Sequence, residues 1–144
     1  MFGIIMSAIA GAAMSFQGVF NTRLSEKIGL YESNMFVQGT AFALAAAAMF
    51  LLGKGNLGQI THVSKLYLLG GVLGLIITIT VMLGMGSLNP TYAVSVILIS
   101  QLLVAAIIDA FGLFDTKQAD FGWNKYVGIA AMIAGVILFK WQRS

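Results

Sequence analysis

The sequence contains no cysteine, one histidine and one proline, and charged residues make up only 9% of its 144 positions. Without cysteine the chain has no thiol nucleophile. One histidine with scattered carboxylates gives no convincing metal site, and no Ser/His/Asp arrangement suits nucleophilic catalysis. His62 itself stands in a glycine-rich, polar stretch that is typical of a loop. The sequence therefore predicts neither an enzyme nor a protein with a metal or another cofactor.

Charge is scarce by the standard of soluble domains, in which about 25% of residues are charged. Hydrophobic residues make up 59% of the chain, and the mean hydropathy is +0.93. Most of the surface of a chain this short faces its solvent, and five acidic and eight basic residues could not cover that surface in water. The composition indicates an integral membrane protein. Its net charge of +3 is what flanking lysines produce, so nucleic-acid binding is not predicted.

Apolar runs predict an all-α protein with five transmembrane helices, at residues 2–20, 34–52, 66–85, 92–114 and 123–141. About 20 apolar residues, at 1.5 Å of rise each, span the hydrocarbon layer of a bilayer. The fifth run contains Lys125 and Lys140, whose side chains can snorkel to the interface. The connections are too short to form another domain, so residues 1–144 are expected to form one bundle, with residues 21–33 as the first link.

The positive charges give no clear orientation. Orientation normally follows an excess of Lys and Arg on the cytoplasmic side. Here the loops divide them evenly, with Lys54, Lys65, Lys117 and Lys125 on the side of the N-terminus and Arg23, Lys27, Lys140 and Arg143 opposite. Either local detail selects one orientation, or copies insert both ways and pair antiparallel. Five helices would then be one half of a ten-helix, inverted-repeat transporter.

Four amide side chains within the expected helices are candidates for binding a transported molecule: Gln17, Asn21, Gln38 and Gln101. Gln17 and Gln38 share a depth in the membrane, and Asn21 follows Gln17 by one helical turn. Amides are costly to bury in lipid without partners. They are expected to pair with one another across helices or with a ligand, and both alternatives stay open.

Asp109 is the only charged residue between positions 92 and 114. One interpretation makes it a carboxylate at the level of the interface, where it meets water or caps a neighbouring helix. The other makes it a site for a proton or a cation. Inverting one copy of the chain brings its Asp109 to the depth of Gln17 and Gln38 of the other copy, so the carboxylate would complete the neighbour's site.

The segments "GAAMSFQGVFNTRL" (residues 11–24) and "SQLLVAAIIDAFGLF" (residues 100–114) resemble the half-size, five-helix YdcZ-like family of the drug/metabolite transporter superfamily. The residues that carry the resemblance are Gln17 with Asn21, Gly70 with Gly71, and Gln101 with Asp109 and Gly112.

The resemblance implies a multi-pass transporter of small molecules in the cell (inner) membrane. It implies an antiparallel homodimer, a heterodimer with a homologous five-helix subunit, or a fused tandem. Alternating access, with proton coupling at Asp109, is the expected mechanism. The alternative from another class is a structural or accessory membrane subunit that binds a partner protein and transports nothing.

Overall fold

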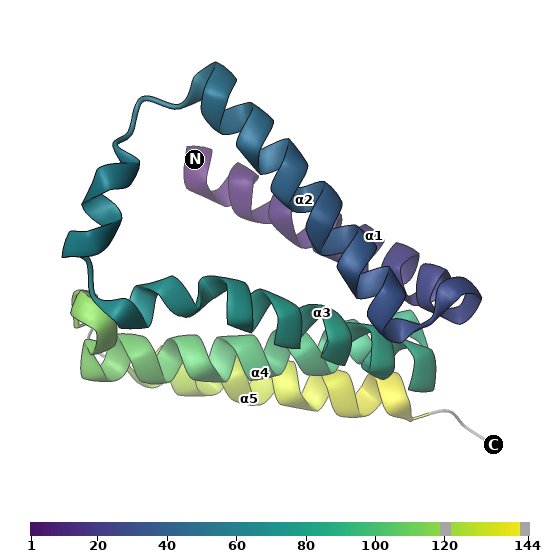
Figure 1. Cartoon of the computed structure of the whole chain (residues 1–144). Coiled ribbons are helices and arrows are strands. Elements are labelled where there is room, and N and C mark those ends of the chain that lie inside the picture. Colours follow the sequence, from purple (N-terminus) through teal and green to yellow (C-terminus); the bar gives the residue numbers. More distant parts are fainter. Residues whose placement is uncertain (119–121, 142–144) are drawn as a thin grey trace. The chain divides into compact units, whose positions relative to one another are not determined.

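The computed structural model describes residues 1–118 and 122–141, and almost all of this part is helical. Its elements are α1 (Phe2–Ile28), α2 (Leu30–Leu52), η1 (Leu57–His62), η2 (Lys65–Leu69), α3 (Gly70–Ser87), α4 (Pro90–Phe111), η3 (Leu113–Asp115) and α5 (Trp123–Lys140). The η elements are short 3-10 helices (Figure 1). The chain divides into two compact units, Met1–Ser87 and Leu88–Ser144. The prediction of an all-α protein is confirmed.

Among the described residues, four helical segments are long and apolar enough to cross a membrane. They are α1, α2, α4 and the continuous segment Lys65–Ser87, with mean hydropathies between 1.6 and 2.4. Four of the five expected spans are thereby confirmed by length and composition. The fifth, α5, carries Lys125 near its start and Lys140 at its end. Its crossing of the membrane stays a prediction that depends on snorkelling of these lysines.

The first connection is much shorter than expected, which corrects the prediction that residues 21–33 form a link. Helix α1 continues to Ile28 and α2 begins at Leu30, so Gly29 alone separates them. Gly29 has a φ angle of 103°, a region that glycine enters without the steric cost of a Cβ. Asn21 and Ser33, at the two ends of the expected link, therefore lie within helices.

The start of α4 follows from local chemistry. The Asn89 side-chain oxygen accepts a hydrogen bond from the Tyr92 amide at 2.9 Å, which caps the helix, and Pro90 occupies the first helical position. Proline suits this position because its missing amide hydrogen would have no partner within the helix. The helix ends before Gly112, whose φ of 59° is left-handed and whose amide donates to the Ile108 carbonyl.

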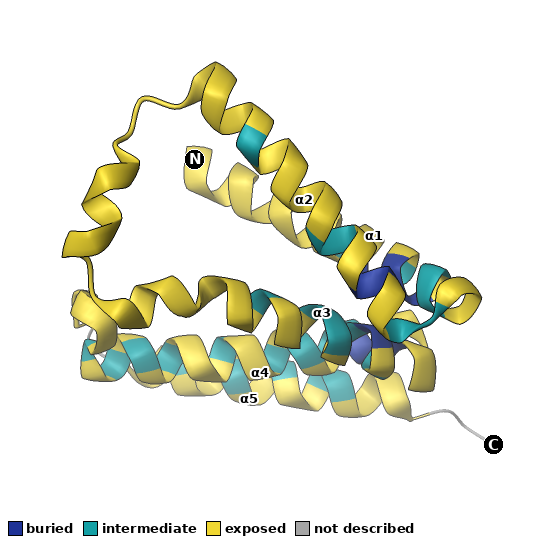
Figure 2. Ribbon diagram, in the orientation of Figure 1, coloured by how far each residue is buried: buried dark blue, intermediate teal, exposed yellow. Residues whose placement is uncertain are grey.

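Helices α1, α2 and α3 pack together within the first unit, and its buried residues gather at one end of it (Figure 2). The residues buried there are Gly18, Asn21, Thr22, Ser33, Asn34, Met82 and Met85. Gly18 of α1 faces Met85 of α3 here. A Cβ at this position would lie 2.6 Å from the Met85 methyl carbon, so a side chain there would require Met85 to shift.

Beyond this point the helices of the first unit expose large apolar side chains. Phe42 and Leu51 of α2, for example, are 76% and 82% exposed. Water would make such exposure costly, whereas lipid tails are as apolar as these side chains. The bare flank of α2 is therefore a surface for lipid or for another apolar helix.

Candidate functional site

Four polar side chains are buried together in the helices that converge in the first unit. Asn21 and Thr22 come from α1, and Ser33 and Asn34 come from α2. We call these four residues the polar cluster. Thr22 satisfies its hydroxyl within its own helix, donating to the Gly18 carbonyl at 2.8 Å. A buried polar group costs free energy unless it is hydrogen-bonded, so the remaining members call for partners.

Two atoms of the polar cluster have no partner among the described residues. The Ser33 hydroxyl oxygen and the Asn34 side-chain oxygen are both buried and make no hydrogen bond there. Ser33 is fully buried and Asn34 is 3% exposed, so neither reaches solvent. A desolvated, unpaired polar group costs about 1–3 kcal/mol. The two atoms are suited to a ligand or an ordered water that offers hydrogen-bond donors.

Gln38 lies one turn after Asn34 on α2 and contacts α3. The Gln38 side-chain nitrogen donates to the Thr78 hydroxyl at 3.3 Å, and Thr78 donates in turn to the Gly74 carbonyl. Gly74 lies beside this amide, and a Cβ there would be in ordinary van der Waals contact with the Gln38 nitrogen, at 3.6 Å. Gln38 therefore links two apolar helices by a hydrogen bond.

We expect the Gln38–Thr78 hydrogen bond to couple α2 and α3 energetically. In a double-mutant cycle of Gln38→Leu and Thr78→Val, the coupling in the free energy of unfolding should be about 0.6 kcal/mol, the average for such bonds in a membrane protein. The matched control is Thr80→Val, because Thr80 bonds only to the Ile76 and Ile77 carbonyls of its own helix. Gln38→Leu and Thr80→Val should be additive, and an equal coupling in both cycles would contradict the assignment.

The other two amides lie elsewhere. Gln17, one turn before Asn21, is exposed and stands outside the polar cluster. Gln101 is exposed on α4, in the second unit. Of the four predicted amides, Asn21 is thus buried in the polar cluster and Gln38 is hydrogen-bonded to Thr78. Gln17 and Gln101 are exposed. Their roles in binding stay predictions.

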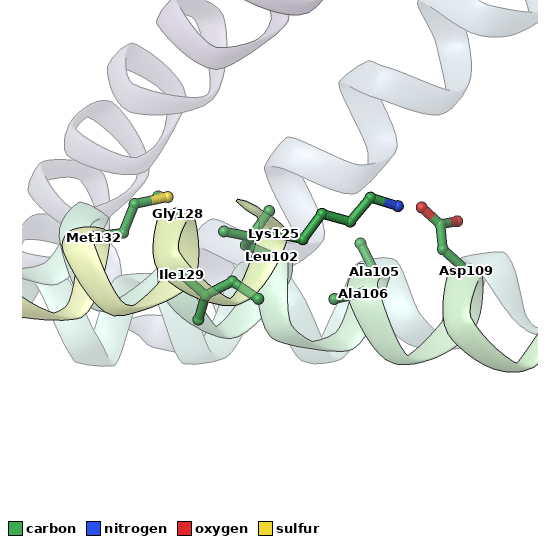
Figure 3. A pocket seen from close by; sticks show the side chains of 8 residues that line it. All are labelled: Leu102, Ala105, Ala106, Asp109, Lys125, Gly128, Ile129 and Met132. Carbon is green, nitrogen blue, oxygen red and sulfur yellow. The ribbon is translucent and has the colours of Figure 1, made fainter. Parts of the chain in front are cut away.

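Asp109 lies at a groove between α4 and α5, the two packed helices of the second unit (Figure 3). The groove has a volume of about 510 Å³ and is lined by Leu102, Ala105, Ala106, Asp109, Lys125, Gly128, Ile129 and Met132. The Asp109 carboxylate and the Lys125 ammonium point toward one another across it (Figure 3). A volume of about 300–1,000 Å³ is typical of ligand pockets. The other lining residues are apolar, so the two charged side chains lie at one end of an otherwise apolar groove.

Several residues of these sites were not identified from the sequence, among them Ser33, Asn34 and Lys125. Ser33 and Asn34 border the stretch that was expected to link two helices, and Lys125 was interpreted only as a snorkelling residue. The spacing of Asn34 and Gln38, one helical turn, repeats that of Gln17 and Asn21 and was the available signal. The sequence around Lys125 could not have indicated its role, because Lys125 comes near Asp109 only through the packing of α5 against α4. In the part of the chain that the structure describes, no group of three potential metal ligands occurs.

Residues 2–138 match the model of a protein family described as "Putative inner membrane exporter, YdcZ". The chain belongs to the YdcZ family. The match covers all four confirmed spans and nearly all of α5, so the resemblance noted in the sequence is confirmed. Comparison with curated proteins and with solved structures gives no match.

Membership of the YdcZ family places the chain in the inner membrane as a multi-pass protein in contact with the lipid bilayer. It also identifies the class of activity as membrane export of the drug/metabolite transporter type, rather than an enzyme class. The exposed apolar flanks of α1 to α4 are consistent with this setting, because each helix meets lipid over much of its length.

Proposed function

We propose that this YdcZ-family chain exports a small polar molecule as an antiparallel dimer of ten helices, by alternating access coupled to protons at Asp109. The polar cluster carries the proposal. Polar residues inside a membrane are expensive, and they mark substrate or ion pathways when they face a bundle interior. The unpaired oxygens of Ser33 and Asn34 are suited to a substrate that donates hydrogen bonds.

Two further features support a second copy. The second half of α2 leaves large apolar side chains exposed, including Phe42, Phe50 and Leu51. With α5 as a fifth span, the chain inverted against a second copy gives the two-fold architecture in which transporters place substrate sites near the midplane. In this arrangement Asp109 of one copy lies at the depth of Gln17 and Gln38 of the other.

We expect the chain to insert in both orientations, because its Lys and Arg residues balance. The tally includes Arg143, which lies outside the described residues. Reporters fused to the C-terminus should give signal from both membrane faces. Replacing the exposed residues Ser87 and Leu88 with lysine should fix that end of α3 in the cytoplasm, since added positive charge decides the orientation. Insertion of the wild-type chain in one orientation alone would exclude the homodimer and leave a heterodimer.

Transport itself is tested in everted inner-membrane vesicles that contain the chain and a pH-sensitive dye. A panel of small polar metabolites and drugs is added in turn, and a substrate should release part of the imposed proton gradient. Asn34→Leu, which removes an unpaired acceptor and keeps similar bulk, should lose this response. A panel that elicits no proton movement and no accumulation in vesicles, together with co-purification of a partner membrane protein, would favour the accessory-subunit alternative.

A further inference from the structure

The groove between α4 and α5 is polar at one end and apolar at the other. Asp109 and Lys125 mark one end, and Leu102 and Met132 mark the other. Each helix contributes two turns to this length, about 10 Å at 1.5 Å of rise per residue. The groove therefore has the polarity and the length of one charged head followed by a short stretch of alkyl chain.

Its orientation matches that of a bilayer leaflet. Asp109 lies within the last turn of α4, which ends at Phe111, and Lys125 lies within the first turn of α5. Both are at helix ends, where headgroups meet water, and the 80% exposed Trp123 beside them has the preference of interfacial tryptophan. The apolar lining extends from there toward the middle of α4, where acyl chains lie.

We propose that this groove binds a zwitterionic phospholipid with a primary ammonium, of the phosphatidylethanolamine class. The ammonium donates hydrogen bonds to the Asp109 carboxylate, and the Lys125 ammonium donates to the phosphate. One acyl chain lies along the apolar lining. In the part of the chain that the structure describes, Asp109 forms no hydrogen bond or ion pair, so its carboxylate is open to such a donor.

Charge complementarity selects this occupant. A helix from another protein would have to bring a cation and an anion to the same end of a 10 Å groove. A lipid with only a negative head would meet Lys125 but face the Asp109 carboxylate with like charge. A phosphatidylethanolamine offers a donor to the Asp109 carboxylate and an acceptor to the Lys125 ammonium with atoms of a single headgroup.

Two small residues of the lining provide the means to block the groove. A Cβ added at Gly128 would meet no atom within 4 Å, so a larger side chain there enters open space instead of the helix contact. Ala105 lines the same groove from α4 and is exposed. The matched control is Ala130, which is exposed on α5, half a turn from Gly128, and is absent from the lining.

The test is lipid binding to the full chain in dodecyl maltoside, measured by native mass spectrometry with dioctanoyl phosphatidylethanolamine and dioctanoyl phosphatidylglycerol. The wild type should prefer the first lipid by about tenfold, which corresponds to one charge-assisted hydrogen bond. Asp109→Asn should remove the preference by weakening phosphatidylethanolamine alone. Lys125→Met should weaken both lipids, because both carry a phosphate.

Gly128→Leu should weaken both lipids about tenfold or more, whereas Ala130→Leu should change neither. Ala105→Leu replaces Gly128→Leu if that variant fails to give a monodisperse, helical protein. Equal affinity of the wild type for the two lipids would overturn the proposal. Unaltered lipid binding by the groove-filling variants would also overturn it. If these variants changed the oligomeric state and not the lipid binding, the groove would be an interface between copies. Binding is read without a proton gradient, so this outcome is independent of the proposed transport.

Discussion

Replacing Asp109 with asparagine is expected to abolish transport driven by a proton gradient. A proton-coupled carrier needs a group that takes up and releases a proton as the substrate moves, and asparagine cannot do so. Asp109 is the only charged residue of the span Pro90–Phe111 and lies near the end of α4. The amide keeps the volume and most of the hydrogen-bonding ability, so the fold and the dimer should persist. Flux in proteoliposomes with and without an imposed pH gradient measures the effect.

The matched control is Asp115→Asn, which removes a carboxylate from η3, outside α4. This variant should transport at the wild-type rate. Normal gradient-driven flux in the Asp109→Asn variant would show that Asp109 is not the residue that couples transport to protons. A variant that instead runs as a monomer where the wild type is dimeric would make Asp109 a structural partner across the interface between copies.

The second large effect is expected at Gly18, where α1 packs against Val81 and Met85 of α3. A Cβ there would lie 2.6 Å from the Met85 methyl carbon and 2.8 Å from its sulfur, and Val81 is 3.2 Å away. Gly18→Leu adds a whole side chain to this contact and should force the helices apart. Overpacking of this kind lowers the free energy of unfolding by about 1–3 kcal/mol. The polar cluster, one turn away, should become accessible to water, which amide hydrogen exchange would detect.

Gly11→Leu is the control, because Gly11 lies two turns earlier on the same face of α1 and a Cβ there meets nothing within 4 Å. It should leave the thermal denaturation midpoint in detergent unchanged. Adding Met85→Ala to Gly18→Leu should restore much of the lost stability, since it removes the atoms that clash. Equal loss in the Gly11 and Gly18 variants would show that bulk on α1 matters, and not the contact with Met85.

The candidate sites were only partly predictable, and particular residues show why. Asn21 and Gln38 were identified because amides in an apolar run are unusual wherever they occur. Gln17 was identified by the same criterion, yet it is exposed, one turn from a buried neighbour. The sequence shows that an amide stands in an apolar run, where burial in lipid would cost free energy. Whether that amide is buried in protein depends on where a second helix packs against the first.

Ser33 and Asn34 show the opposite case. They border the charged segment that contains Arg23, Glu26, Lys27 and Glu32, which suggests a loop by composition alone. The helices continue through most of this segment, supported by an Arg23–Glu26 ion pair at 2.9 Å and interrupted only at Gly29. Hydropathy locates the apolar part of a helix that crosses the membrane, but the helix itself can extend well beyond that part, as α1 and α2 do.

The sequence alone determined the membrane setting, the helical class and four of the spans, and its motifs indicated the family. The first three follow from local quantities, which are the transfer of apolar residues into lipid and hydrogen bonding within a helix. Only the tertiary structure decided that Gly18 brings α1 to Met85, that Ser33 and Asn34 are buried without partners, and that Lys125 faces Asp109. The physical reason is that these are contacts between helices, and helix packing depends on the fit of side chains that the periodicity of one segment does not contain.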